Sequence, residues 1–132
     1  SFLFHSFVLP RSILLLRSPM KEFHLLIDDI RNEDMCGVTD ISFDVIARTS
    51  QDGMNILEHS PVTHLWLDND LGELMEGIDI LNWARANDCI PPHVTLVTAN
   101  TIGKRRMEET LSNDVGYTRR NLNSRWWNKP VD

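Results

Sequence analysis

The stretch FHLLIDD, residues 23–29, joins a short, mainly apolar run to two aspartates. Three further runs have the same form: VIA before Arg48, LWL before Asp68 and VTLV before Thr98. Such runs are typical of strands buried in a parallel sheet. The carboxyl ends of these strands lie along one edge, and ligands bind where the strand order reverses. The acidic and hydroxyl side chains at these ends therefore indicate a phosphate site assisted by a metal ion.

The segments between the strands predict helices that cover the sheet. Residues 50–59 and 74–88 carry apolar side chains at helical spacing, and Thr101 can cap a third helix that runs through Leu111. Strands that alternate with helices predict an α/β fold with a doubly wound, mostly parallel sheet of four to five strands. Residues 28–41 are short and mostly polar, so we expect a reduced first crossover.

Composition favours one soluble domain with an acidic body. The chain has 132 residues, 42% of them apolar, and a formal net charge of −6. Residues 20–103 hold 15 acids and four Lys or Arg, whereas residues 104–132 hold seven Lys or Arg and four acids. This distribution lacks the broad basic face of a nonspecific nucleic-acid binder, so we do not expect double-stranded DNA as a partner.

The two ends of the chain differ from its body. Residues 1–19 are apolar but interrupted by Pro10, Arg11 and Arg17, and they fit neither a membrane span of about 18 residues nor a signal peptide. We expect Met20 to be the natural start and residues 1–19 to be an extension, either non-native or a docking arm. Residues 113–132 are expected to form a basic tail or an edge strand.

The cysteines and histidines show no metal-binding spacing. Cys36 and Cys89 are isolated in the sequence, which predicts reduced thiols and a cytoplasmic location without a membrane partner. Four of the five histidines are likewise scattered, and we expect them to be surface or packing residues: His24, His59, His64 and His93.

Several motifs follow one another in a recognisable order: LIDDIR at 26–31, VIART at 45–49, LWLDNDLG at 65–72 and TAN at 98–100. Together they resemble the cyclic-phosphate-processing receiver-like domain, a relative of response-regulator receivers, over residues 20–112. The resemblance implies a receiver-like or flavodoxin-like fold. It also implies an enzyme that processes cyclic phosphates, in RNA ends or nucleotides, at an acidic pocket.

Three aspartates at the strand ends are the expected metal ligands. Asp28 and Asp29 follow the first strand and Asp68 follows the third. Mg²⁺ prefers hard oxygen ligands, and a cation would relieve the repulsion between carboxylates placed so close together. By the same resemblance Asp68 and Asp70 are the expected catalytic acids, and Asp68 would hold the metal or orient water. Asp70 and Gly72 also suit a tight turn.

Five residues are candidates for binding phosphate. Thr98 offers a hydroxyl group and Asn100 an amide, next to a helix start that favours anions. The other three carry positive charge, and the two guanidinium groups suit a bidentate clamp: Arg31, Arg48 and Lys104. The partner would be a phosphorylated small molecule or an RNA end.

Two positions depart from the family pattern and leave the function open. The family carries histidines where this chain has Asn69 and Val97, and histidine is the usual proton-transfer group near neutral pH. The alternative is therefore a catalytically degenerate module that binds a phosphorylated ligand or a protein partner. An aspartyl-phosphate signalling receiver is the weakest hypothesis, because the lysine expected after a fifth strand is not evident.

Overall fold

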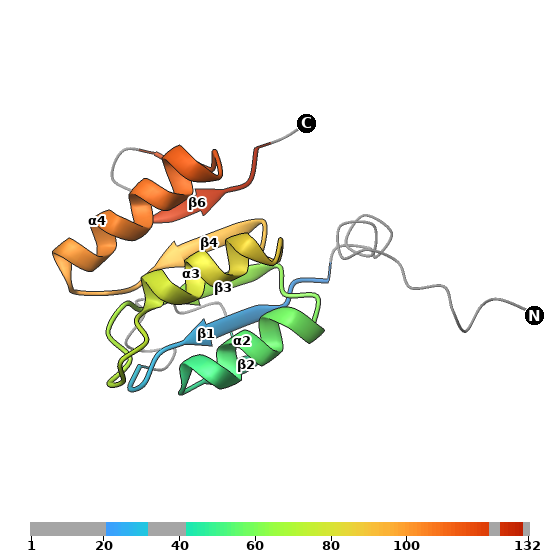
Figure 1. Ribbon diagram of the computed structural model, residues 1–132. Coiled ribbons are helices and arrows are strands. Elements are labelled where there is room, and N and C mark those ends of the chain that lie inside the picture. Colours follow the sequence, from blue (N-terminus) through green and yellow to red (C-terminus); the bar gives the residue numbers. More distant parts are fainter. Residues whose placement is uncertain (1–20, 32–41, 122–124, 131–132) are drawn as a thin grey trace, which may run out of the picture.

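The computed structural model describes residues 21–31, 42–121 and 125–130, which form a six-stranded sheet with three helices on one face (Figure 1). The strands are β1 (His24–Ile27), β2 (Val45–Ala47), β3 (His64–Leu67), β4 (His93–Leu96), β5 (Thr118–Arg119) and β6 (Trp126–Asn128). The helices are α2 (Ser50–His59), α3 (Gly77–Ala86) and α4 (Thr101–Glu109), and a π-helical turn, η3 (Thr110–Asp114), extends α4. Within the described residues no helix is long and apolar enough to cross a membrane.

The sheet confirms the predicted fold class. Its order is β2-β1-β3-β4-β6-β5, with the first four strands parallel. The strand order reverses between β1 and β3, as a doubly wound sheet requires. The sheet has six strands rather than four to five, because β6 pairs antiparallel with β4 and β5 pairs antiparallel with β6. The expectations about the first crossover and residues 1–19 concern segments outside the described residues, as does that about Cys36.

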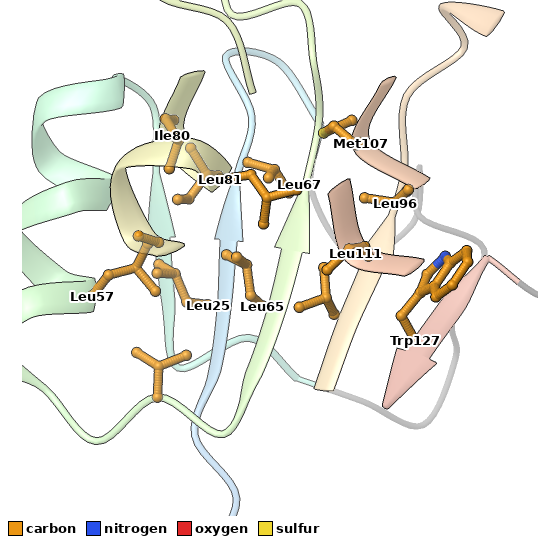
Figure 2. Close-up of a cluster of buried hydrophobic side chains, with 14 of the residues drawn as sticks. Leu25, Leu57, Leu65, Leu67, Ile80, Leu81, Leu96, Met107, Leu111 and Trp127 are labelled. Atoms are coloured by element: carbon orange, nitrogen blue, oxygen red, sulfur yellow. The ribbon is translucent and has the colours of Figure 1, made fainter. Parts of the chain in front are cut away.

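The main core lies between the sheet and the three helices (Figure 2). Alternate residues of β1, β3 and β4 face the helices, because successive side chains of a strand point to opposite faces. Truncating a leucine in such a core to alanine typically costs about 2–5 kcal/mol. The fully buried members of this core include Leu25, Ile27, Leu57, Leu65, Leu67, Ile80, Leu81, Met107 and Leu111, while Cys89 is also buried there.

Polar residues fix the helix starts. The Thr49 hydroxyl accepts the Asp52 N–H at 3.2 Å and caps α2. The cap of α4 is Asn100 rather than Thr101, since its Oδ1 accepts the Gly103 N–H at 3.0 Å. Helix α3 begins at Gly77 rather than residue 74, because a capping box between Glu76 and Asp79 sets its first turn.

The second face of the sheet carries a small apolar cluster and a row of histidines. Leu26, Phe43, Trp66 and Val97 form the cluster. His24, His64 and His93 stand in register on β1, β3 and β4. Their rings stack, with centroids 4.1 Å apart for the first pair and 4.4 Å for the second. Burial, together with the adjacent imidazoles, lowers the pKa of His64 to about 4.

The lowered pKa of His64 in this row makes the free energy of unfolding depend on pH. Unfolded His64 takes up a proton near its ordinary pKa of 6.5, whereas the folded residue resists protonation until about pH 4. The unfolded state therefore binds more protons between these values, and stability falls as the pH falls through that window. We expect a loss of up to about 3 kcal/mol from this residue.

Urea denaturation across this pH window measures the effect. His64→Phe keeps an aromatic ring but does not titrate, so the variant should lose less stability on acidification than the natural sequence. Parallel losses in both proteins would contradict the assignment.

Candidate functional site

The predicted metal ligands come together at the carboxyl ends of β1 and β3. Ile27 pairs with Leu67 in the parallel ladder, so the residues that follow them are neighbours. The Asp68 N–H continues this ladder by donating to the Ile27 carbonyl at 3.1 Å. Asp28 is fully buried and Asp68 is 4% exposed. Carboxylate oxygens of Asp28, Asp29 and Asp68 lie within 4.8 Å of one another, a donor set that fits a divalent cation.

Arg31 bridges the two buried carboxylates. Its Nη1 lies 3.0 Å from Asp28 Oδ2 and 3.1 Å from Asp68 Oδ2. Asp28 Oδ1 also accepts the backbone N–H groups of Ile30 and Arg31, both at 2.9 Å. The loop after β1 therefore wraps around Asp28 and places one cation between two acids, which reduces their mutual repulsion.

The two buried carboxyls have pKa values shifted in opposite directions. Burial by itself raises the pKa of Asp28, but the two backbone N–H donors and the Arg31 guanidinium outweigh it and hold this pKa below its ordinary value. Burial and, to a lesser extent, the charge of Asp28 raise the pKa of Asp68, although the Thr98 hydroxyl and Arg31 oppose them. Paired carboxyls whose pKa values are pushed apart are characteristic of acid–base sites.

An open pocket of about 390 Å³ lies over these carboxylates. Its described lining consists of Asp28, Asp29, Ile30, Arg31, Asp68, Asp70, Gly72 and Ala99. Gly72 has a φ of +71°, and a Cβ there would lie 3.0 Å from Asp29 Oδ2, so both backbone conformation and space favour glycine. Asp70 is exposed at the rim, where its Oδ1 accepts the Asn100 Nδ2–H at 3.2 Å.

The five predicted phosphate-binding residues do not all lie at the pocket. Arg31 lines the pocket, and Thr98 contacts Asp68 directly. Asn100 caps α4 and contacts Asp70. Arg48 donates to the backbone carbonyls of Asp28 and Arg31, which supports the loop after β1. Lys104 is half-buried on α4 and is not among the described lining residues.

Asn69 and Val97, at the two positions where the family carries histidines, are also not among the described residues that line the pocket. Asn69 is buried against α3, where its Nδ2 donates to Glu76 Oε2 and its Oδ1 accepts the Ile78 N–H, both at 3.1 Å. Val97 packs in the cluster on the second face. Both residues support the fold around the site.

The sequence did not point to the apolar rim of the site. The large hydrophobic residues exposed within the described part of the chain are Ile30, Leu74 and Ile102. Ile30 lies three residues after β1 and is the one of the three that lines the pocket. Single exposed apolar residues are ordinary, so it is the position of Ile30 at the pocket that carries information.

Residues 23–113 match the family model of the cyclic-phosphate processing receiver domain. The chain belongs to this family. The match covers more than half of the chain and includes all three predicted metal ligands. No curated protein matches this chain.

The solved structures that match this chain include two receiver proteins. The signal receiver domain of a protein described as a Luxo repressor, from Vibrio parahaemolyticus, is 23% identical, with a TM-score of 0.53 over 67% of this chain and 72% of that chain. The MaeR response regulator bound to beryllium trifluoride is 20% identical, with a TM-score of 0.45 over 71% of this chain and 77% of that chain. At 23% identity the likeness to the Vibrio parahaemolyticus domain concerns the fold alone.

Gly77 connects the site to α3, and its substitution tests that connection. A Cβ at this position would lie 2.1 Å from the Asp68 carbonyl oxygen, so Gly77→Ala must displace either α3 or the loop that carries Asp68. We expect a loss of more than about 2 kcal/mol in the free energy of unfolding.

Gly116→Ala is the matched control in urea denaturation. A Cβ at Gly116 meets nothing within 4 Å, so only its φ of +71° opposes alanine, at a cost of about 1 kcal/mol. Equal losses in the two variants would show that the contact at Gly77 is unimportant.

Proposed function

We propose that this receiver domain hydrolyses a cyclic phosphate, in an RNA end or a nucleotide, with Mg²⁺ bound by Asp28, Asp29 and Asp68. The observation that carries the proposal is the pair of buried carboxyls, Asp28 and Asp68, with oppositely shifted pKa values under an open pocket. Membership of the cyclic-phosphate processing family supports the same substrate class.

The residues of the pocket have complementary roles in this reaction. Water attacks phosphorus, one ring P–O ester bond breaks, and a phosphate monoester forms. Asp68 would orient the attacking water and accept its proton, which then passes to the departing alkoxide. Asp70 holds the same water from the exposed rim. The bound Mg²⁺ would neutralise charge on the phosphoryl oxygens.

Arg31 supplies the phosphate contact, and Thr98 positions Asp68. The guanidinium of Arg31 already lies between the two acids, and rotation toward the pocket would place it on a phosphoryl oxygen. The Thr98 hydroxyl, which contacts Asp68, would keep that carboxylate oriented. The apolar rim residue Ile30 offers a surface for the nucleoside part of the ligand.

A second candidate is a module that binds a phosphorylated ligand, or a protein partner, without turnover. The described lining of the pocket contains no imidazole, and Arg31 already compensates the two acids in the way a metal ion would. Tight binding without product would distinguish this function from hydrolysis.

We also propose a cytoplasmic location for the domain. RNA ends and nucleotides are available in the cytoplasm. The buried position of Cys89 is compatible with a thiol that stays reduced there.

Turnover of 2′,3′-cyclic AMP with Mg²⁺ tests the proposal directly. We expect a monophosphate product by ³¹P NMR, and at least about a 100-fold lower rate for Asp68→Asn. Asp114→Asn is the control, because Asp114 is exposed, pairs with Arg85 at 3.3 Å and is not among the described residues that line the pocket. Absence of both product and binding would exclude both candidate functions.

Arg31→Gln separates metal binding from phosphate binding. The variant removes a cation that competes for Asp28 and Asp68, so Mg²⁺ should bind about tenfold more tightly. A cyclic nucleotide should bind more weakly, because its guanidinium partner is lost. Calorimetry measures both affinities, with Arg48→Gln as a control whose side chain contacts backbone carbonyls. Unchanged or weaker Mg²⁺ binding would contradict this role of Arg31.

A further inference from the structure

The loop between β3 and α3, residues 68–76, contributes to the lining of the acidic pocket through Asp70 and Gly72. The next residue, Glu73, contacts α2, because its carboxylate accepts both the backbone N–H and the hydroxyl of Ser50. We propose that Glu73, through this contact with Ser50, is a positioning residue for the Mg²⁺ site. The inference rests on the proposed function and concerns how the loop keeps that site in shape.

Ser50 provides a fixed anchor for the loop. It is the first residue of α2 and is only 5% exposed. The first N–H groups of a helix have no partner within the helix, and the helix dipole favours a negative charge beside them. The Ser50 backbone N lies 3.0 Å from Glu73 Oε2, while the Ser50 hydroxyl donates to Oε1. The two donors use both carboxylate oxygens, which fixes the orientation of the Glu73 side chain.

The ionised form of Glu73 suits this contact. The Ser50 hydroxyl and, to a lesser extent, the Ser50 backbone N–H lower the pKa of Glu73. Glu73 itself is exposed, so its charge remains in contact with water while the buried serine supplies the donors. A carboxylate, which has two acceptor oxygens, can therefore hold the loop on α2 without being buried.

A second contact holds the same loop from the opposite side. Asp70 Oδ1 accepts the Asn100 Nδ2–H at 3.2 Å, and Asn100 caps α4. Helices α2 and α4 follow β2 and β4, the two strands that flank β1 and β3 in the sheet (Figure 1). The contacts of Glu73 and Asp70 therefore keep the loop stretched across the carboxyl ends of β1 and β3.

Glu73 acts on the metal ligands through its neighbour Gly72. A Cβ on Gly72 would lie 3.0 Å from Asp29 Oδ2, so the Gly72 backbone packs closely on this carboxylate. Asp28 and Asp68 are buried, whereas Asp29 is partly exposed, and its orientation depends most on what packs beside it. Loss of the contact at Glu73 would free Gly72 to move away and leave Asp29 less well oriented toward the ion.

Calorimetric titration of the full chain with Mg²⁺ tests the proposal. Glu73→Ala should bind Mg²⁺ about tenfold more weakly, at the low end of the range for residues that orient metal ligands. Ser50→Ala should cause a smaller loss, because its backbone N–H still donates to Glu73. In the Glu73→Ala background Ser50→Ala should have no further effect, since both changes act on one contact. Glu73→Gln keeps one acceptor oxygen and should recover part of the affinity.

Asp52→Asn is the matched control for the lost charge. Asp52 is exposed in the first turn of α2, and its backbone N–H rather than its carboxylate takes part in the cap. This variant should bind Mg²⁺ as the natural sequence does.

Urea denaturation of the same variants distinguishes positioning from a purely structural contact. A lower free energy of unfolding in Glu73→Ala with unchanged Mg²⁺ affinity would overturn the positioning role and leave the proposed function intact. Independent, additive losses of Mg²⁺ affinity in the double variant would also overturn it. Absence of Mg²⁺ binding by the natural sequence would overturn the proposed Mg²⁺ site and this inference with it.

Discussion

The parallel pairing of β1 with β3 sets the positions of the side chains at both ends of these two strands. One register, from His24 opposite His64 to Ile27 opposite Leu67, fixes both edges of the sheet. At the carboxyl edge it places Asp28 beside Asp68, and at the amino edge it places the histidines face to face. A slip of one residue would turn these side chains to opposite faces and separate both groups.

The site is built into the packing of the domain. Helix α3 begins in direct contact with the backbone of Asp68 and Asn69, and the Gly77 N–H donates to the Asn69 carbonyl at 2.9 Å. Gly103 of α4 packs just as closely on the Asn69 side chain. The residue next to the central aspartate therefore anchors two helices, which explains how an amide at this position supports the site although it does not line the pocket.

Local patterns in the sequence predicted much of this arrangement, and non-local contacts explain the rest. Apolar runs followed by acids located β1, β3 and the three aspartates, because burial and strand ends leave a direct mark on the sequence. The start of α3 depends on the fit of Gly77 against Asp68, which no local pattern encodes. Strand β5 has only two exposed residues, too few for a hydrophobic alternation. The histidine row was missed because its spacing exists across strands rather than along the chain.

We propose that Asp28 and Asp68 form one cation-dependent phosphate site in which Arg31 bridges the two carboxylates and turns to the anion when it binds. A crystal structure of the protein with Mg²⁺ and tungstate, a phosphate mimic, tests it most directly. We predict Mg²⁺ on the carboxylates of Asp28 and Asp68, the anion in the pocket beneath Ile30, and the Arg31 guanidinium turned onto the anion. An Arg31 that still bridges the two acids, with metal and anion bound elsewhere on the molecule, would rule out this site.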